Sequence, residues 1–241
     1  MNSPLQRNPL ESAPPRWSIA VMCYNEKDAL KPMVERTLAV MRPLGDSFEI
    51  LIVNDGSKDG SKVIADQLAA ANPEVRVFHH PTNYGIGQVL IDGYGQTKGE
   101  SVVILPADLQ FAPEDLPAAM KELEGADVVN ITREHRHDPF MRKMISSFDQ
   151  NLVWLLFGLR AGDLHWVKLY RRHVLSAITI QSRTPLVDTE LLVKAHRNKA
   201  RIKEVILPHH PRLTGQSTGG RPMLLIKTFI DLIKLRFTLK M

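Results

Sequence analysis

The sequence has a single cysteine, few aromatic residues and no long apolar run. Of its 241 residues only Cys23 is a cysteine, so no disulfide can form within the chain, which is typical of a reducing compartment. The longest apolar stretch, LVWLLFGL from Leu152, is far shorter than the ~20 residues that span a bilayer. The first residues lack the apolar segment of a signal peptide. We therefore expect a protein that is soluble or bound to a membrane surface.

Charge and composition favour anionic partners without identifying one. Lys and Arg total 31 against 26 Asp and Glu, which gives a mild formal charge of +5. Aromatic residues make up 6%, and no basic-aromatic platform is present, so we expect no nucleic-acid partner. Hydrophobic residues make up 44%, which is enough for one large globular domain.

Short apolar strands alternate with helical segments along the chain. Strand-like apolar runs occupy 17–24, 48–54, 75–80, 101–105 and 126–132. Apolar residues recur at helical spacing over 27–41 and 62–71, and we expect further helices after the 83–88 turn and after Pro113. Beyond residue 132 we expect helices over 140–159, 186–197 and 223–239, and strands over 165–172 and 202–211. This alternation predicts an α/β fold with a mainly parallel sheet flanked by helices.

Three regions follow from this pattern. Residues 1–16 are typical of a disordered N-terminal tail, 17–220 of the folded domain, and 221–241 of an amphipathic C-terminal helix. In that helix Lys227, Asp231, Lys234 and Thr238 form one narrow polar stripe, and nearly all other positions are apolar. The pattern suits a helix on a membrane surface or against a membrane partner, with docking on the protein's own core or on a second copy as the alternative.

Polar residues gather where the predicted strands end. Right-handed crossovers would bring 24–26, 55–59, Asn83 and Asp108 to one edge of the sheet, where open α/β sheets bind ligands.

Each of three motifs at this edge has a functional and a structural interpretation. The DGSKDGS loop could bind a nucleotide or be an ordinary turn. In NYGIGQ, Gly85 and Gly87 permit close backbone approach to a phosphate, or they make a structural turn. In ADLQ, Asp108 and Gln110 could hold a metal, or form a solvated turn.

Taken together and in order, these motifs are specific. The series is YNE, VNDGSKDGS, NYGIG, ADLQ, TREHRHDPFMRKMISSF, D-x-x-x-x-K-L-Y-R-R, DTELL and HHPRLTGQSTGG. It resembles glycosyltransferase family 2, of GT-A fold, and within it the dolichol-phosphate mannose synthase branch, which puts sugars on polyprenyl phosphates. The resemblance covers nearly the whole chain after Trp17, so it implies that 17–220 is a GT-A domain.

The resemblance implies a role for each matching residue. Donor-binding residues would be Tyr24, Glu26, Asp55, Gly56, Ser57, Asp59, Gly87 and Arg212. Asp108 and Gln110 would face a Mg²⁺ or Mn²⁺ ion. The catalytic residues would be Asp108, Arg133, Arg142 and Ser146. Of these, Arg133, Arg142 and Ser146 would hold the acceptor phosphate. The donor would be GDP-mannose or a UDP-hexose, and the place of action the cytoplasmic face of a membrane.

The chain departs from the family pattern at the metal loop. Pro106-Ala107-Asp108 stands where the family usually has Asp-x-Asp, and Asn54 stands where many relatives have an Asp. Losing a carboxylate should weaken metal binding, although one carboxylate suffices for Mg²⁺ in principle because phosphates and water fill the other positions. An inactive or metal-independent protein is the alternative.

The middle of the chain favours a phosphate acceptor. Residues 131–172 carry eight basic and four acidic residues, which suits phosphate binding, or a solvated basic face. A phosphate is already anionic and needs no general base, whereas a hydroxyl acceptor does, and Asp188 and Glu190 are the fallback candidates. We read these two acids more simply as surface or helix-start residues, and His209 and His210 as structural.

The resulting hypothesis is an inverting transfer of a hexose from a nucleoside diphosphate sugar to a polyprenyl (dolichyl or undecaprenyl) phosphate. Two alternatives stay open: a family 2 enzyme that acts on a hydroxyl, and a catalytically degenerate nucleotide-sugar-binding protein.

Overall fold

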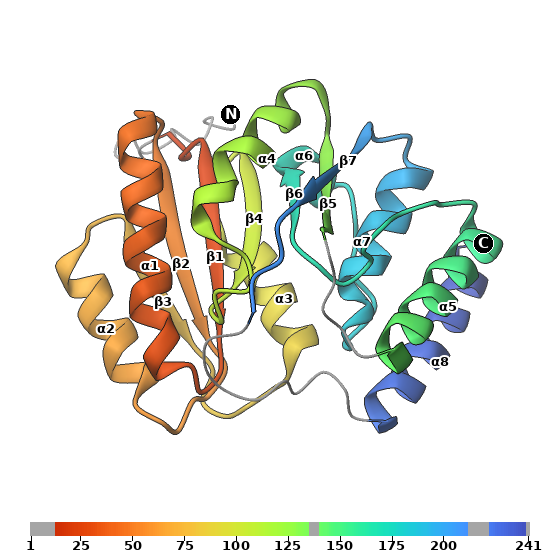
Figure 1. The fold of residues 1–241 in the computed structure, drawn as a ribbon, viewed down its shortest axis with the longest axis horizontal. Helices are drawn as coiled ribbons and strands as arrows, with labels where there is room; N and C mark the ends of the chain where they lie inside the picture. The colour runs from red at the N-terminus through yellow and green to blue at the C-terminus, as the bar shows by residue number, and fades with distance from the viewer. Residues whose placement is uncertain (1–12, 135–139, 212–221, 240–241) are drawn as a thin grey trace, which may run out of the picture.

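The computed structural model describes residues 13–134, 140–211 and 222–239 (Figure 1). Seven strands form one sheet in the order β3-β2-β1-β4-β6-β5-β7. The strands are β1 (Trp17–Cys23), β2 (Phe48–Asn54), β3 (Val75–His79), β4 (Ser101–Pro106), β5 (Val128–Arg133), β6 (Lys168–Arg171) and β7 (Ile202–Leu207). All pairings are parallel except those of β6, which runs antiparallel between β4 and β5. The predicted α/β fold is confirmed.

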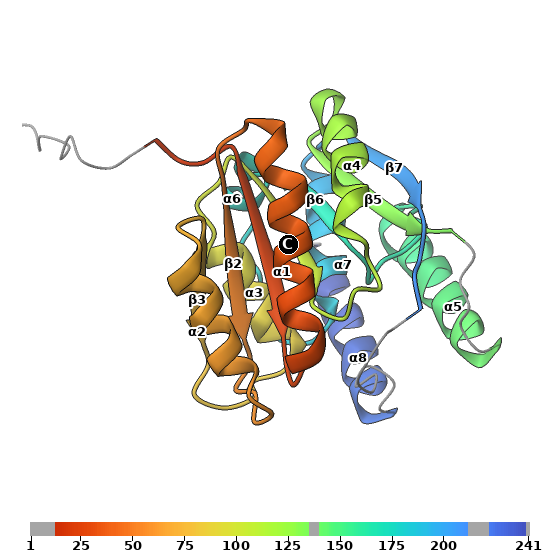
Figure 2. The same ribbon diagram turned by 60° about the vertical axis from the view of Figure 1, so that its left-hand side comes forward.

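Helices cover both faces of the sheet (Figures 1 and 2). They are α1 (Lys27–Met41), α2 (Ser61–Ala71), α3 (Ile86–Gln96), α4 (Leu116–Glu122), α5 (Phe140–Phe157), α6 (Arg172–Ser176), α7 (Leu186–Arg197) and α8 (Pro222–Thr238), with short 3-10 turns at Arg42–Leu44, Pro113–Asp115 and Leu123–Gly125. The predicted strand over 165–172 is shorter than expected, because Arg172 begins a helix and its guanidinium turns back to the carbonyl oxygens of Gly99 and Tyr94.

Alternate residues of each strand build the two sides of the core. In β1, Ile19 and Val21 belong to a cluster with α1, whereas Ala20 belongs to a second cluster with α3 and α7. This alternation of period two explains why the strands read as nearly continuous apolar runs, since both faces are buried. The carboxyl ends of β1, β2 and β4 consequently share one edge, the lower edge of the sheet in Figure 1.

Candidate active site

Two loops of this edge, after β1 and β2, are tied together by hydrogen bonds. The Asn25 backbone N–H donates to Oγ of Ser57 (3.0 Å), and the Asn25 side-chain oxygen accepts the N–H of Lys58 (2.8 Å). The N–H of Lys27 donates to a carboxylate oxygen of Asp59 (3.0 Å). Asn25 has a left-handed φ of 54°, which Asn tolerates better than most residues. Ser57 and Asp59 therefore fix the path of the loop that follows β1.

The predicted donor residues Tyr24 and Glu26 lie in that loop. Tyr24 keeps 37% of its surface exposed, whereas Glu26 is buried and its backbone N–H donates to Oγ of Ser61 (3.1 Å). Burial alone would raise the pKa of Asp59, but hydrogen bonds from Ser61 and from the Lys27 N–H outweigh it and lower that pKa. The structure thus brings these residues together at one edge, and their contacts with a nucleotide stay a prediction.

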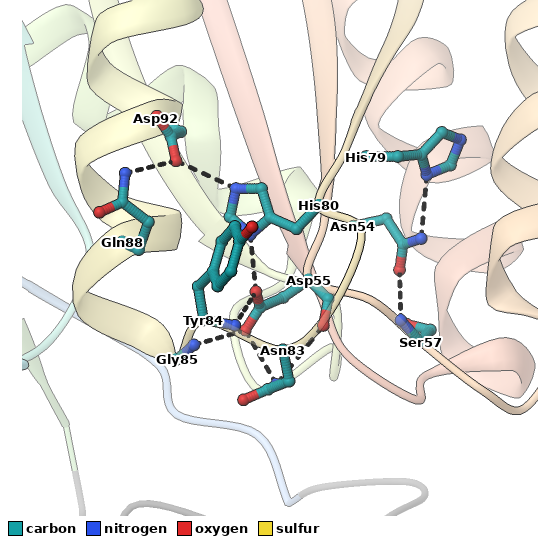
Figure 3. Close-up of polar contacts among 10 residues, drawn as sticks. All are labelled: Asn54, Asp55, Ser57, His79, His80, Asn83, Tyr84, Gly85, Gln88 and Asp92. Atoms are coloured by element: carbon teal, nitrogen blue, oxygen red, sulfur yellow. Dashed lines mark hydrogen bonds and ion pairs between the residues drawn. The ribbon is translucent and has the colours of Figure 1, made fainter.

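The buried carboxylate of Asp55 makes four hydrogen bonds within the protein (Figure 3). Oδ1 lies 2.6 Å from Nδ1 of His80 and accepts the N–H of Tyr84 (2.8 Å). Oδ2 accepts from the Asn83 side chain (2.9 Å) and from the N–H of Gly85 (2.9 Å). An ionised carboxylate offers about four lone-pair sites, so these contacts occupy its capacity. Asp55 shapes the loop before α3, and a direct contact with the nucleotide would have to displace one of these bonds.

Two glycines let neighbouring segments meet backbone to backbone. Gly56 has a φ of +67°, and a Cβ there would lie 2.4 Å from the carbonyl carbon of Thr82. A Cβ on Gly87 would lie 2.1 Å from the carbonyl oxygen of Arg183. At Gly87 the chain's own 183–184 backbone makes the close approach, and the predicted approach to a phosphate stays a prediction.

The loop after β4 carries Asp108 and Gln110. Asp108 is 7% exposed, and its Oδ1 accepts the N–H of Gln110 (3.1 Å). Leu109 between them has a φ of 59°, which is uncommon for a residue with a branched side chain. The carbonyl of Gln110 accepts the N–H of His210 (3.0 Å), so the chain after β7 is joined to this loop.

Asp55 and Asp108 leave the sheet on either side of β1. The parallel ladders pair Cys23 with Asn54 and Met22 with Pro106, so the two loops begin at the same level. Strands lie about 4.8 Å apart, which separates the ends of β2 and β4, on either side of β1, by about 10 Å. The predicted donor loop and metal loop are therefore neighbours.

Arg133, at the end of β5, forms a buried ion pair with Asp163 (2.9 Å). The side chain donates from Nε (3.2 Å) and Nη2 (2.9 Å), and the backbone N–H donates as well (2.9 Å). The guanidinium lies 4.8 Å from the ring centre of Trp166, whose ring packs on His209 with centroids 5.3 Å apart. Nε2 of His209 lies 3.3 Å from Nε2 of Gln110. A continuous set of contacts therefore joins Arg133 to the loop of Asp108.

The remaining acceptor residues are placed only in part. Arg142 and Ser146 both lie on α5, four residues apart, which is about one helical turn. The side chain of Arg142 and the whole of Arg212 lie outside the described residues. For Arg133, the acceptor role stays a prediction, and its charge is balanced by Asp163.

The basic segment 131–172 does not form one phosphate-facing surface among the residues described. Lys168 is 1% exposed and donates to the carbonyl oxygens of Leu164 and Trp166, and burial lowers its pKa. Arg171 and Arg172 hydrogen-bond to backbone carbonyls of the neighbouring loops. Lys168 therefore lies on neither a phosphate face nor a solvated face, whereas for Arg171 and Arg172 the two interpretations stay open.

The interpretation of Asp188 and Glu190 as surface or helix-start acids is confirmed for Asp188, which lies near the start of α7, and is wrong for Glu190. Glu190 is fully buried, and its carboxylate accepts the N–H groups of Gln181 (2.8 Å) and Ser182 (2.7 Å) and pairs with Lys194 (2.5 Å). Asp188 lies in the first turn of α7 and accepts from the hydroxyl of Tyr94 (3.2 Å), and burial raises the pKa of its carboxyl.

The possible metal ligands at this edge of the sheet suit an ion that is also bound by the substrate. No group of three or more His, Cys, Asp or Glu among the described residues is placed to hold an ion. Asp108 is the carboxylate of its loop, so an ion there would need phosphate and water oxygens as further ligands. Mg²⁺ with a nucleotide is usually bound in this way.

Sequence comparison points to one family. Residues 18–181 match Glycosyl transferase family 2. Proteins from Serratia proteamaculans (33% identical over 223 residues) and Photorhabdus laumondii (35% over 220) are both named undecaprenyl-phosphate 4-deoxy-4-formamido-L-arabinose transferase. Each alignment covers 90% of this chain and 66% of the relative, so the chain spans about two thirds of their length.

Solved structures agree on the fold. Glucosyl-3-phosphoglycerate synthase from Mycobacterium tuberculosis, in complex with Mn²⁺, UDP and glucosyl-3-phosphoglycerate, matches with a TM-score of 0.69 at 17% identity, over 92% of this chain and 80% of that one. A mannosyltransferase from Pyrobaculum calidifontis, in complex with GDP-Man and Mn²⁺, matches with a TM-score of 0.66 at 18% identity, over 95% and 68%. Combined with the match over 18–181, this fold shows that the chain belongs to glycosyl transferase family 2, as its order of motifs predicts.

Proposed function

We propose that this chain is an inverting glycosyltransferase that moves a sugar from a nucleotide sugar to a polyprenyl phosphate. One observation carries the proposal: the Asp108 loop, joined by contacts to Arg133, lies beside the loops 24–26 and 55–59 at one sheet edge. The names of the relatives support the acceptor class. Those names specify a pentose derivative, whereas the resemblance of the motifs implies a hexose, so both kinds of sugar belong in the test.

On the donor side, the nucleotide would lie over Tyr24, Glu26 and the 56–59 loop. Asp108 would hold Mg²⁺ or Mn²⁺ with Gln110, and the bound ion would stabilise the charge that leaves with the nucleoside diphosphate. Asn25 joins the loop after β1 to the loop after β2 by hydrogen bonds, so the nucleotide pocket would be largely formed before the donor binds.

On the acceptor side, the environments of Glu190 and Asp188 argue for a phosphate. A hydroxyl acceptor needs a base within hydrogen-bond reach, but the Glu190 carboxylate is buried and already bonded to backbone N–H groups and to Lys194. Asp188 is held by Tyr94. A phosphate acceptor needs only cations to steer it, and Arg133 with Arg142 and Ser146 on α5 would supply its contacts, while Arg212 would reach the donor diphosphate.

A transfer assay tests the proposal. The protein would be incubated in detergent with Mg²⁺ or Mn²⁺, undecaprenyl or dolichyl phosphate, and radiolabelled GDP-mannose, UDP-hexoses or a UDP-pentose, and the label extracted into organic solvent. We expect label in the lipid fraction with one donor and its loss in Asp108→Asn. Donor binding without lipid-linked label for any donor would contradict the proposal.

Pro106 alone favours a second candidate, a nucleotide-sugar-binding protein without turnover. Pro106 ends β4 opposite Met22, where the family pattern has a carboxylate. Calorimetry with and without divalent ions separates the two functions, since the second predicts donor binding that is independent of metal.

We also propose that α8 places the protein at the cytoplasmic face of a membrane. Leu232 and Leu235 are buried in the cluster that includes α7, so one side of the helix docks on the protein's own core. Phe229, Ile230 and Phe237 are exposed on the other side. Among the helices within the described residues, none is both long and apolar enough to cross a bilayer. A helix with an exposed apolar side beside a polar stripe that carries Lys227 and Lys234 suits the interface of an anionic membrane.

A further inference from the structure

His80, which directly follows β3, lies between two carboxylates (Figure 3). Its Nδ1 is 2.6 Å from Oδ1 of Asp55, and its Nε2 is 3.0 Å from Oδ2 of Asp92 on α3. The imidazole side chain is 3% exposed. The rings of Phe78 and Tyr84 pack on it with centroid distances of 5.5 and 5.0 Å. Two carboxylates and two aromatic rings therefore face this histidine.

Both ring nitrogens of His80 lie within hydrogen-bond distance of a carboxylate oxygen. Ionised carboxylates only accept hydrogen bonds, and a neutral imidazole has one N–H, so only the imidazolium donates to both partners. Charge-assisted bonds of this kind are about twice as strong as neutral ones. His80 thereby ties α3 to the loop that follows β2.

The contacts continue from Asp92 to a cavity. Oδ2 of Asp92 also accepts from the Gln88 side-chain amide (2.8 Å), and the oxygen of that amide accepts from Nη1 of Arg183 (3.3 Å). Tyr84, Gln88 and Arg183 line a cavity of about 340 Å³, which is within the usual range of ligand sites. Tyr84 is fixed at its backbone N–H by Asp55. Both carboxylates that bind His80 therefore position residues of the cavity wall.

We propose that His80 is a positioning residue for the nucleotide-sugar donor. Held between Asp55 and Asp92, it keeps Tyr84 and Gln88 where they contact the sugar-diphosphate part of the donor. Asp55 then acts on the donor through the 83–85 loop, not by touching the base. The inference rests on the proposed function, because it takes the cavity as part of the donor site.

Donor affinity of the variants tests the proposal directly. Calorimetry with UDP-glucose, GDP-mannose and the donor found active, in Mg²⁺ and without acceptor, would give Kd for the wild type, His80→Gln and Asp92→Asn. Removing residues that support a ligand site typically costs ten- to a hundredfold. We expect His80→Gln to raise Kd and KM at least tenfold with a smaller change in kcat.

A comparison of donor affinity with stability separates positioning from a merely structural role. A residue that only stabilises the fold should lower the unfolding free energy without changing the donor Kd of the folded protein, whereas a positioning residue should raise donor Kd and KM in the folded variant. Asp66→Asn is the matched control, since Asp66 is exposed and pairs with the neighbouring His79 (2.9 Å). It should keep the wild-type Kd and KM.

Each result decides the question. If His80→Gln fails to fold, Asp92→Asn still supplies the donor Kd, because Asn has the shape of Asp. Unchanged donor Kd in either folded variant would overturn the proposal. These results are independent of turnover: a wild type that binds donor without forming lipid product refutes the proposed transfer and leaves the His80 test intact. A wild type that binds no nucleotide sugar refutes both.

Discussion

Gly87 and Arg183 touch through their backbones: a Cβ on residue 87 would lie 2.1 Å from the carbonyl oxygen of Arg183 and 2.8 Å from the N of Thr184. The partner segment cannot easily yield, because the buried Glu190 carboxylate holds the N–H groups of Gln181 and Ser182. The contact joins α3 to the segment before α7 and sets one wall of the cavity that Arg183 lines.

Gly87→Ala should therefore weaken both folding and donor binding. Overpacking of this kind typically costs about 1–3 kcal/mol of unfolding free energy, which urea denaturation would measure. Gly95→Ala in the same helix is the matched control, because a Cβ there meets nothing within 4 Å and the change should be neutral or stabilising. Equal effects of the two substitutions would show that the contact with Arg183 is unimportant.

The course of the chain was largely predictable from the sequence. The alternation of buried strands and helices is continuous, and the ends of β1, β2 and β4 carry the polar residues that the structure brings together. Strand ends can be assigned in this way because parallel βαβ units place all of them on one edge.

The partners of the site residues were not predictable. Asp163 reaches Arg133, and His209 reaches Gln110, only because β6 and β7 flank β5 at the far end of the sheet. No local spacing encodes pairs that are 30 or 99 residues apart. The pair of histidines at 79 and 80 was a readable signal for a site, but the sequence does not show that His80 faces Asp92.

Restoring the missing acid should strengthen metal binding. Pro106→Asp recreates the Asp-x-Asp pattern at the end of β4, two residues before Asp108. A second carboxylate adds charge to the ligand set, so we expect the Mn²⁺ concentration that gives half-maximal donor binding to fall about tenfold. Pro106→Asn, which adds a neutral oxygen of similar shape, is the control and should change it less. An unchanged metal requirement in Pro106→Asp would contradict a metal at Asp108.

Breaking the Arg133–Asp163 pair should destabilise the fold strongly. Both side chains are buried, and removing one partner of a buried ion pair costs about 3–5 kcal/mol. We expect this loss for Asp163→Ala in urea denaturation. Glu114→Ala, which breaks the exposed Arg36–Glu114 pair, should cost about 1 kcal/mol or less. An equally small loss of unfolding free energy in Asp163→Ala and Glu114→Ala would contradict a stabilising role for the buried pair.

Stability should fall at acid pH partly through Asp127, at the start of the β5–β7 ladder. The hydrogen bond from Arg201 lowers the pKa of the Asp127 carboxyl from 3.8 to about 2. A group whose pKa is lower in the folded state stabilises fully above its unfolded pKa and loses this contribution as the pH falls. The unfolding free energy of the wild type should therefore drop between pH 4 and 2 more than that of Asp127→Asn. Parallel curves for the two proteins would disprove the contribution.

Membrane binding should depend on the exposed apolar side of α8. Phe237 is 64% exposed, and burying such a side chain in a membrane interface is worth about 1.5–3 kcal/mol. Phe237→Asp should lower sedimentation with phosphatidylglycerol vesicles at least tenfold. Thr238→Asp adds the same charge one residue further, on the polar stripe, and should bind nearly as the wild type does. If both variants bind equally, the attraction is electrostatic alone, and the apolar side of α8 faces another partner.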